Sequence, residues 1–284
     1  MKKRMFILTV TALVFMTVIG CTRAPASGSA AGGSTGGAVA QTAAPSTLQK
    51  IIQSKKMVIG CILSFPPFGY KDEQGNPQGY DVEIAKLVGK SLGASVEIVD
   101  VTADARIPSL QTGKVDLIIG NFTRTLERAQ AVDFTNPYIA AGERLLVRKD
   151  GGIKQNSDVA GKKVGVTKGS TNADLAKSLW PTANIVYFDT SADALVGLKN
   201  KQCDTFLEDS NFQAYQAKLD PNLEVVGDSL ISLEYNGFGV KKGDQDWLNY
   251  LNLFIFNMNV NGTNKALYRQ FFGMDPVYPL NPQY

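Results

Sequence analysis

Residues 115–138 constrain the fold of this chain more than any other segment, because they join a buried strand to a polar turn. The strand is predicted by a β-branched, apolar run: Val115, Leu117, Ile118 and Ile119. Residues 120–125 are expected to form the turn at its carboxyl end. Ligands of open α/β sheets bind at that end. The segment therefore predicts an α/β fold with a binding site at this turn.

The turn carries polar groups suited to a carboxylate. Asn121 and Thr123 lie in it, and it leads into a short predicted helix bearing Arg128. A hydroxyl, free backbone N–H groups and a guanidinium can converge there on one anion. Alternatively, Arg128 caps its own helix or pairs with a neighbouring acid, and Thr123 is an ordinary capping residue. Phe122, between Asn121 and Thr123, is either pocket wall or core.

Strand and helix patterns alternate from Lys56 onward, which predicts the α/β class with mostly parallel, right-handed crossovers. A first series is followed by a long strand at residues 143–148, and a second series begins at residue 163. A return strand at 237–241 then leads to helices at 247–260 and 265–272. Two crossings between the series predict a hinge.

The segment around Thr123 and Arg128 resembles the amino-acid-binding branch of bacterial extracellular solute-binding proteins, family 3, which serve ABC importers. The matching positions are Thr123, Arg128, Asp133, Phe134, Pro137 and Tyr138. Residues 58–101, 161–179 and 201–215 extend the resemblance to about 48–273. It implies a two-lobed, type II periplasmic-binding-protein-like fold. Each lobe is expected to be a mostly parallel sheet flanked by helices, and two strands are expected to form the hinge.

The predicted domain boundaries follow from this resemblance. Residues 48–142 plus 240–284 are expected to form lobe 1, and residues 143–239 lobe 2, with hinge strands at both ends. The resemblance also implies a monomer.

The same resemblance implies site residues in both lobes. Arg128 and Thr123 would bind the ligand α-carboxylate, Asp209 the α-ammonium, and Phe65 would stack on the ligand. Ser170 and Thr171, in a turn of the second lobe, would close on the carboxylate. Asn121 and Phe122 would complete the pocket. For Asp209, capping the next helix is the alternative.

The nature of the ligand side chain is inferred from positions at which this sequence differs from relatives in the family. Ile62 stands where relatives with basic or amide ligands place an aspartate, and Ala103 where many have a second stacking aromatic. Arg106 resembles an arginine that some acidic-amino-acid binders direct at the side chain; a solvent-facing helix arginine is the alternative. Both departures, at Ile62 and Ala103, argue against a cationic ligand. The sequence therefore favours an acidic or amide amino acid over lysine and arginine, although Glu208 could reverse the local field.

The N-terminus resembles a bacterial lipoprotein signal. Lys2, Lys3 and Arg4 precede an apolar stretch at 5–19, and Gly20 precedes Cys21. Residues 1–20 are expected to be removed and Cys21 acylated, although an ordinary secretory signal is the alternative. Residues 21–47, rich in Gly, Ala, Ser and Thr, are expected to form a disordered lipid tether. The protein would be anchored to a membrane on its extracytoplasmic side.

Charge and composition exclude several classes of protein. The chain has 29 Lys plus Arg and 26 Asp plus Glu, and signal removal leaves 29 − 3 = 26 of the former, so the mature chain is formally neutral. This argues against nucleic acid as a partner. The chain has no histidine, which excludes histidine-based triads and most zinc sites. No cofactor or metal is expected. Cys61 and Cys203 are expected to be buried and unpaired, although a disulfide remains possible outside the cytoplasm.

The predicted function is a receptor that delivers a polar amino acid to the permease of an ABC importer, without catalytic residues. A prephenate or arogenate dehydratase on the same fold is the alternative, in which Glu208, Glu143 or a lysine would donate the proton. A ligand-sensing protein is a third reading.

Overall fold

The computed structural model describes residues 45–280. These residues belong to one compact unit. The predicted signal at 1–20, Cys21 and most of the predicted tether lie outside the described residues. No helix within residues 45–280 combines the length and the apolar character that crossing a membrane requires.

Lobe 1 is built on a five-stranded sheet. Its strand order is β5 (Ser95–Asp100), β1 (Lys56–Cys61), β6 (Leu117–Ile118), β13 (Glu234–Lys241) and β7 (Val132–Ala141). β1 pairs in parallel with β5 and β6, whereas β13 pairs antiparallel with β6 and β7. The predicted boundary at residue 240 falls inside β13, which pairs along its length with lobe 1.

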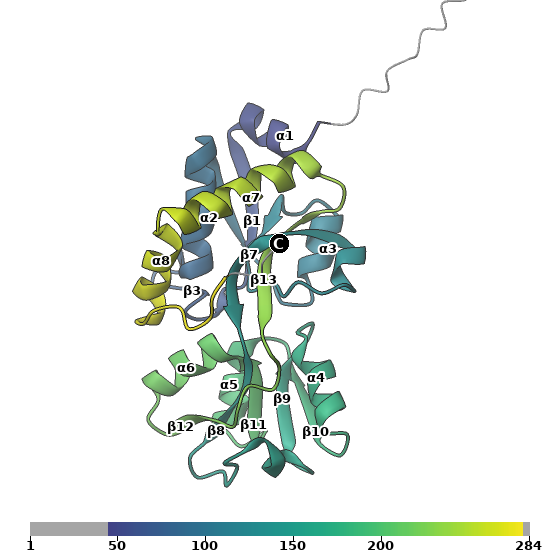
Figure 1. The fold of residues 1–284 in the computed structure, drawn as a ribbon, viewed down its shortest axis with the longest axis vertical. Helices are drawn as coiled ribbons and strands as arrows, with labels where there is room; N and C mark the ends of the chain where they lie inside the picture. Colours follow the sequence, from purple (N-terminus) through teal and green to yellow (C-terminus); the bar gives the residue numbers. More distant parts are fainter. Residues whose placement is uncertain (1–44, 281–284) are drawn as a thin grey trace, which may run out of the picture. The chain divides into compact units, whose positions relative to one another are not determined.

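Helices cover both faces of this sheet (Figure 1). They are α1 (Thr47–Ser54), α2 (Tyr80–Leu92), α3 (Arg106–Gln111), α7 (Gln245–Val260) and α8 (Thr263–Phe272). A small sheet of β2 (Ser64–Phe65), β3 (Gly69–Lys71) and β4 (Pro77–Gln78) precedes α2. Helix α2 ends at Gly93, which adopts φ 59° and whose N–H returns to the last turn. Ile59, Val88 and Trp247 are fully buried in the core of this lobe.

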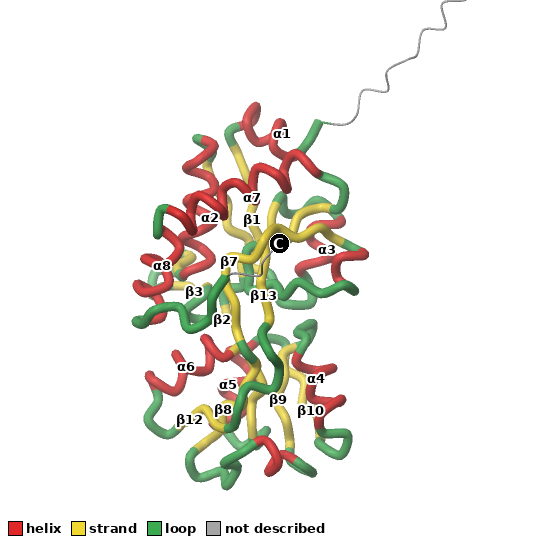
Figure 2. Tube along the Cα trace, in the orientation of Figure 1, coloured by secondary structure: helices red, strands yellow, loops and turns green. Residues whose placement is uncertain are grey.

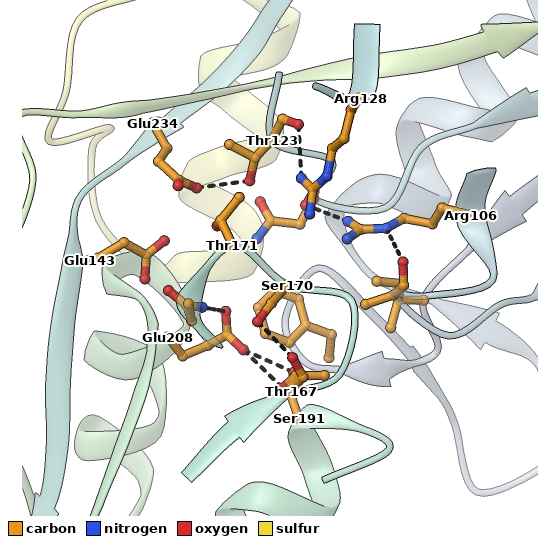
Figure 3. A pocket seen from close by; sticks show the side chains of 15 residues that line it. Arg106, Thr123, Arg128, Glu143, Thr167, Ser170, Thr171, Ser191, Glu208 and Glu234 are labelled. Carbon is orange, nitrogen blue, oxygen red and sulfur yellow. Dashed lines mark hydrogen bonds between the residues drawn. The ribbon is translucent and has the colours of Figure 1, made fainter. Parts of the chain in front are cut away.

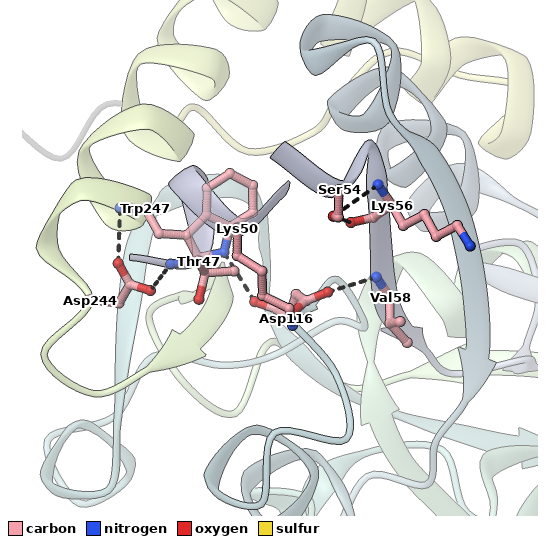
Figure 4. A network of polar contacts seen from close by, with 8 residues as sticks. All are labelled: Thr47, Lys50, Ser54, Lys56, Val58, Asp116, Asp244 and Trp247. Atoms are coloured by element: carbon pink, nitrogen blue, oxygen red, sulfur yellow. Dashed lines mark hydrogen bonds and ion pairs between the residues drawn. The ribbon is translucent and has the colours of Figure 1, made fainter. Parts of the chain in front are cut away.

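Helix α1 is fastened to lobe 1 by a network of polar contacts (Figure 4). The Thr47 N–H donates to Asp244 Oδ2 at 2.8 Å, and Lys50 Nζ donates to Asp116 Oδ1 at 2.8 Å. Asp116 Oδ2 also accepts the Val58 N–H of β1 at 2.9 Å, and its carbonyl accepts Trp247 Nε1–H at 3.0 Å. Asp116 thus joins α1, β1 and α7.

Lobe 2 repeats the same plan. Its sheet has the order β10 (Asn184–Phe188), β9 (Lys163–Thr167), β11 (Thr205–Asp209), β8 (Glu143–Arg148) and β12 (Leu223–Val226). Its helices are the 3₁₀ turn η2 (Asn156–Val159), α4 (Asn172–Leu179), α5 (Ser191–Lys199) and α6 (Ser210–Leu219). β9 pairs in parallel with β10 and β11, and β8 pairs antiparallel with β11 and β12.

The prediction of mostly parallel sheets needs a correction. Each five-stranded sheet has two parallel and two antiparallel pairings, so both sheets are mixed. In each sheet both antiparallel pairings come from a single reversed strand, the one by which the chain enters that lobe from the other: β13 in lobe 1 and β8 in lobe 2. The short helix predicted at Arg128 is a 3₁₀ turn, η1 (Arg128–Gln130).

The two crossings between the lobes run side by side. The chain passes from β7 to β8 at Gly142 and returns from β12 to β13, with Glu234 paired to Ala141 (Figure 2). A Cβ added at Gly142 would lie 2.4 Å from Ser229 Oγ of the returning segment, so no larger residue fits there without movement. The predicted two-strand hinge is therefore present.

Candidate functional site

A pocket lies between the lobes, at the carboxyl ends of β1, β6, β9 and β11, where ligands of α/β sheets bind. It encloses about 390 Å³ of space, counting the part that opens to solvent. Its lining is Ile62, Phe65, Ala103, Arg106, Asn121, Thr123 and Arg128 before the first crossing, then Glu143, Thr167, Ser170, Thr171, Asn172, Ser191, Glu208 and Glu234. Seven of the nine predicted ligand-binding residues thus line it; Phe122 and Asp209 do not.

Arg128 reaches across the pocket from η1 (Figure 3). Its Nη1 donates to the Thr123 carbonyl and its Nη2 to the Gly169 carbonyl of the opposite lobe, both at 2.9 Å. Thr125 Oγ1 accepts the Arg128 N–H at 3.1 Å, which fixes the start of the turn. Burial lowers the pKa of the Arg128 guanidinium, which nevertheless stays charged at neutral pH.

Arg106 is buried, with 3% of its surface exposed. Its Nε donates to the Ala103 carbonyl at 2.8 Å, and its Nη1 to the carbonyls of Gly120 at 3.0 Å and Asn121 at 2.9 Å. Its Nη2 donates to the Gly169 carbonyl at 3.2 Å. Burial, then the nearby charge of Arg128, lowers the pKa of Arg106 to about 9. The solvent-facing alternative is wrong, but four of the five guanidinium N–H groups serve backbone carbonyls.

The two guanidinium groups therefore converge on one oxygen, the carbonyl of Gly169. Both guanidinium groups lie over the Phe122 ring, whose centroid is 4.4 Å from Arg106 Cζ and 5.2 Å from Arg128 Cζ. Phe122 is 1% exposed and packs against Phe134, so of its two predicted roles the structure supports core. The position of the Gly169 oxygen marks where this pocket best accommodates negative charge.

The other predicted side chains of lobe 1 already have protein partners. Thr123 Oγ1 donates to Glu234 Oε2 at 2.8 Å, and the Asn121 Nδ2 donates to Asp209 Oδ2 at 3.2 Å. Phe65 is stacked between Phe68, at 5.0 Å between centroids, and a ring of the opposite lobe. An edge of Phe65, rather than a free face, therefore meets the pocket.

Ser170 and Thr171 line the pocket from the turn before α4. Ser170 Oγ donates to the Thr167 carbonyl at 2.6 Å, and Gly169 adopts φ 73°. A Cβ on Gly169 would lie 2.5 Å from the Asp104 backbone, so the glycine lets this turn approach lobe 1.

Asp209 caps α6, as its alternative reading proposed. Its Oδ1 accepts the N–H groups of Asn211 at 2.7 Å and Phe212 at 3.4 Å. Burial, followed by the charge of Glu208, raises the pKa of Asp209 to about 7. The Asp209 carboxylate does not line the pocket itself but is hydrogen-bonded to Asn121, which does.

Three glutamates face the arginines across the pocket, and we call Glu143, Glu208 and Glu234 the acidic wall (Figure 3). Glu208 accepts from Thr167 Oγ1, Ser191 Oγ and Asn172 Nδ2, each at 3.2 Å, and from the Asp209 N–H at 3.1 Å. Sequence reasoning missed Glu234 and considered Glu143 only as a proton donor. Glu143 begins β8 and Glu234 begins β13, each directly after a crossing between the lobes. The prediction of a two-strand hinge could therefore have pointed to both glutamates.

The described residues contain no group of three or more His, Cys, Asp or Glu side chains arranged to hold a metal ion. Cys61 and Cys203 are buried free thiols, which confirms the prediction that they are unpaired. The pocket has a basic end, formed by Arg106 and Arg128, and an acidic wall.

The chain was compared with known proteins. Residues 57–274 match the sequence model of bacterial extracellular solute-binding proteins, family 3. A glutamine-binding protein of Geobacillus stearothermophilus is 37% identical over 211 residues, covering 72% of this chain and 80% of the relative.

Two solved structures are also similar. One is an ancestral amino acid-binding protein described as a precursor of cyclohexadienyl dehydratase, with 38% identity, a TM-score of 0.76, and coverage of 80% of this chain and 100% of that one. The other is a solute receptor for L-cysteine of Neisseria gonorrhoeae, with 34% identity, a TM-score of 0.76, and coverage of 79% and 92%. The predicted two-lobed, type II fold is confirmed.

Proposed function

We propose that this chain, which belongs to family 3 of the bacterial extracellular solute-binding proteins, binds a polar amino acid between its lobes and delivers it to an ABC importer. The observation that carries the proposal is the convergence of Arg106 and Arg128 on the Gly169 oxygen. Two fixed cations meet a neutral carbonyl there. A ligand carboxylate at the same place would offer both cations an opposite charge, which the neutral carbonyl lacks.

The α-carboxylate therefore belongs at the basic end. Arg128 is the principal partner, because it keeps fewer backbone bonds than Arg106. Thr123, Ser170 and Thr171 line the same end of the pocket. Their hydroxyl and N–H groups complete the anion site once the Gly169 carbonyl gives way.

We assign the α-ammonium to Asp209, with Asn121 as the group it displaces. In the structure the Asn121 amide donates to Asp209 Oδ2. This N–H occupies the lone pair that a ligand ammonium would use. A charged donor on a buried carboxylate is stronger than the amide it replaces.

Ligand binding is coupled to closure of the lobes. Contacts between lobes already include the Arg128 bond to Gly169 and a bond from Gln216 Nε2 to the Pro66 carbonyl at 3.2 Å. A ligand that touches both lobes favours this closed arrangement, because it makes those contacts only when the lobes meet. The importer then recognises the closed receptor.

The ligand side chain is proposed to donate hydrogen bonds. The predicted preference for acidic side chains depended on free N–H groups of Arg106, and the structure gives four of these to carbonyls. The acidic part of the prediction thereby loses its physical basis. The amide part keeps one, since an amide NH₂ can donate to Glu208 or Glu234 of the acidic wall.

We also propose that the receptor is held at the extracytoplasmic face of a membrane by acylation of Cys21. The supporting feature is the Gly20–Cys21 junction after a short apolar stretch. Cys21→Ala should move the protein from the membrane fraction to the soluble fraction. Mass spectrometry showing an unacylated Cys21 in the unaltered protein would contradict the anchor.

A receptor explains the pocket better than an enzyme does. One similar structure is a precursor of a dehydratase, so prephenate or arogenate turnover is the rival. Glu208, a candidate proton donor of that reaction, already accepts four hydrogen bonds. Burial raises the pKa of Glu208 above its ordinary value, but its oxygens are already occupied by these protein donors and are not free to protonate a substrate.

A thermal-shift screen against the twenty amino acids tests the receptor, with prephenate incubation as the enzyme arm. A ligand at 100 times its dissociation constant stabilises the folded protein by about 2.7 kcal/mol. The proposal fails if no amino acid raises the melting temperature of the folded protein, or if prephenate is consumed.

A further inference from the structure

The acidic wall is carried by the hinge as well as by lobe 2. Glu143 begins β8 directly after the first crossing, and Glu234 begins β13 directly after the second. The segment before β13 is tied to Glu143, whose carbonyl accepts the Leu230 N–H at 2.9 Å. Glu208 joins them from the end of β11. The two hinge strands, β8 and β13, thus each present one carboxyl group to the same pocket.

One oxygen of the acidic wall lacks a hydrogen-bond partner. Glu143 is 2% exposed, and its buried Oε2 has no hydrogen-bond partner among the described residues. Glu143 also lines the pocket. An unpaired buried carboxyl oxygen costs free energy unless a donor fills the space beside it. In contrast, Glu208 is saturated by four donors, and Glu234 Oε2 accepts from Thr123.

The charges around the pocket are unequal. Arg106 and Arg128 supply two positive charges, whereas the acidic wall and Asp209 supply four carboxyl groups. Burial raises the pKa of Glu143, Glu208 and Asp209, because an uncompensated negative charge is unfavourable among these buried groups. A positively charged side chain would stabilise the ionised carboxylates, whereas an acidic side chain would bring a further like charge beside them.

We propose that the acidic wall is the subsite for a positively charged side chain of the bound amino acid, with Glu143 Oε2 and Glu234 as its direct partners. This inference rests on the proposed receptor function and names the ligand class of the same site. The α-carboxylate lies at the arginines and the side-chain cation at the hinge. The ligand thereby spans the pocket and contacts both hinge strands.

The decisive comparison is between L-arginine and L-citrulline, which share their length and shape but differ in the charge of the side-chain end. We expect calorimetry to show arginine binding at least about tenfold more tightly than citrulline, and no binding of L-glutamate. Glu143→Gln and Glu234→Gln should each reduce the ratio to less than about threefold, because the carboxylate charge is lost and the shape is kept. Glu73→Gln, on the exposed hairpin, is the matched control and should leave the ratio unchanged.

Several outcomes separate this inference from the function on which it rests. If the folded protein binds none of these ligands, nor any other of the twenty amino acids, the receptor proposal itself fails. If glutamine, citrulline or glutamate binds as tightly as arginine, the receptor stands and the cation subsite is wrong. The subsite is also wrong if both glutamine variants fold, as judged by circular dichroism, and keep the tenfold ratio.

Discussion

Phe65 of lobe 1 stacks on Phe212 of lobe 2, with ring centroids 4.5 Å apart and ring planes 5° apart. Both rings are buried, and Phe212 lies in the first turn of the helix that Asp209 caps. The ring expected to stack on the ligand thus stacks on the opposite lobe instead. Closure of the lobes and the position of α6 are joined at this contact.

This stack predicts a measurable coupling between lobes. Phe65→Ala and Phe212→Ala should each lower the free energy of unfolding by roughly 3 to 5 kcal/mol. The double variant should lose less than the sum, with a coupling of about 0.5 to 1.5 kcal/mol. Urea unfolding measures all three. Phe256→Ala, at a 60% exposed position, should change stability little. Strict additivity of the two substitutions would show that the rings do not interact in solution.

Truncation of Arg128 should abolish ligand binding while the fold survives. Removing one partner of a buried charged pair costs about 2 to 5 kcal/mol, or roughly 30-fold to several-thousand-fold in affinity. Calorimetry with the best ligand of the amino-acid screen measures the loss. Arg269→Ala, which removes an exposed ion pair with Asp275, serves as the control. A loss smaller than about threefold in Arg128→Ala would remove this residue from the site.

Buried carboxyl groups predict a pH dependence of stability. Asp81 is 1% exposed and accepts from Tyr138 Oη at 2.8 Å and the Asn121 N–H at 3.1 Å. Burial raises the pKa of Asp81 to about 7. The folded state then binds more protons than the unfolded state between about pH 4 and 7, so the stabilisation present below about pH 4 is lost as the pH rises through this range.

The variant Asp81→Asn isolates this contribution. Its melting temperature relative to the unaltered protein should increase from pH 4 to pH 7, because only the unaltered protein must ionise a buried carboxyl group. Melting curves at four pH values measure the difference. A constant difference across the range would mean that Asp81 does not titrate with a raised pKa.

The two described cysteines should resist modification in the folded protein. Burial raises the pKa of the Cys203 thiol to about 11 and that of Cys61 well above its ordinary value, so little reactive thiolate is present at pH 8. Using Cys21→Ala as background, a colorimetric thiol reagent should react slowly with native protein and quickly with both thiols in denaturant. Absence of reaction in denaturant would indicate a disulfide.

Local patterns predicted much of the fold because they depend on neighbouring residues. The apolar face and glycine stop of α2 and the apolar run of β11 are readable from a few positions. The same holds for the segment that carries Thr123 and Arg128, which lies where a strand meets a turn. Such elements are predictable from the sequence because they do not depend on tertiary packing.

The partners of the side chains were not readable in this way. Thr123 meets Glu234 across 111 positions, and Asn121 meets Asp209 across 88. Such pairs depend on how the hinge aligns two lobes. Arg106 shows the same difficulty, since its type suggested a ligand contact, whereas the path of the Gly120 and Asn121 carbonyls decided its bonds. Which oxygen an arginine meets is decided by the tertiary structure.

The attachment of α1 determines which lobe receives a force applied to the N-terminal side of the chain. Thr47 and Lys50 are bound to Asp244 and Asp116, all of lobe 1, and none of these residues belongs to a hinge strand (Figure 4). A force transmitted through residue 45 therefore acts first on lobe 1, and it reaches lobe 2 through the two crossings and through contacts between the lobes such as the Phe65–Phe212 stack. If the chain is anchored at Cys21, as proposed, lobe 1 would stay in place and lobe 2 would move relative to it as the lobes open and close.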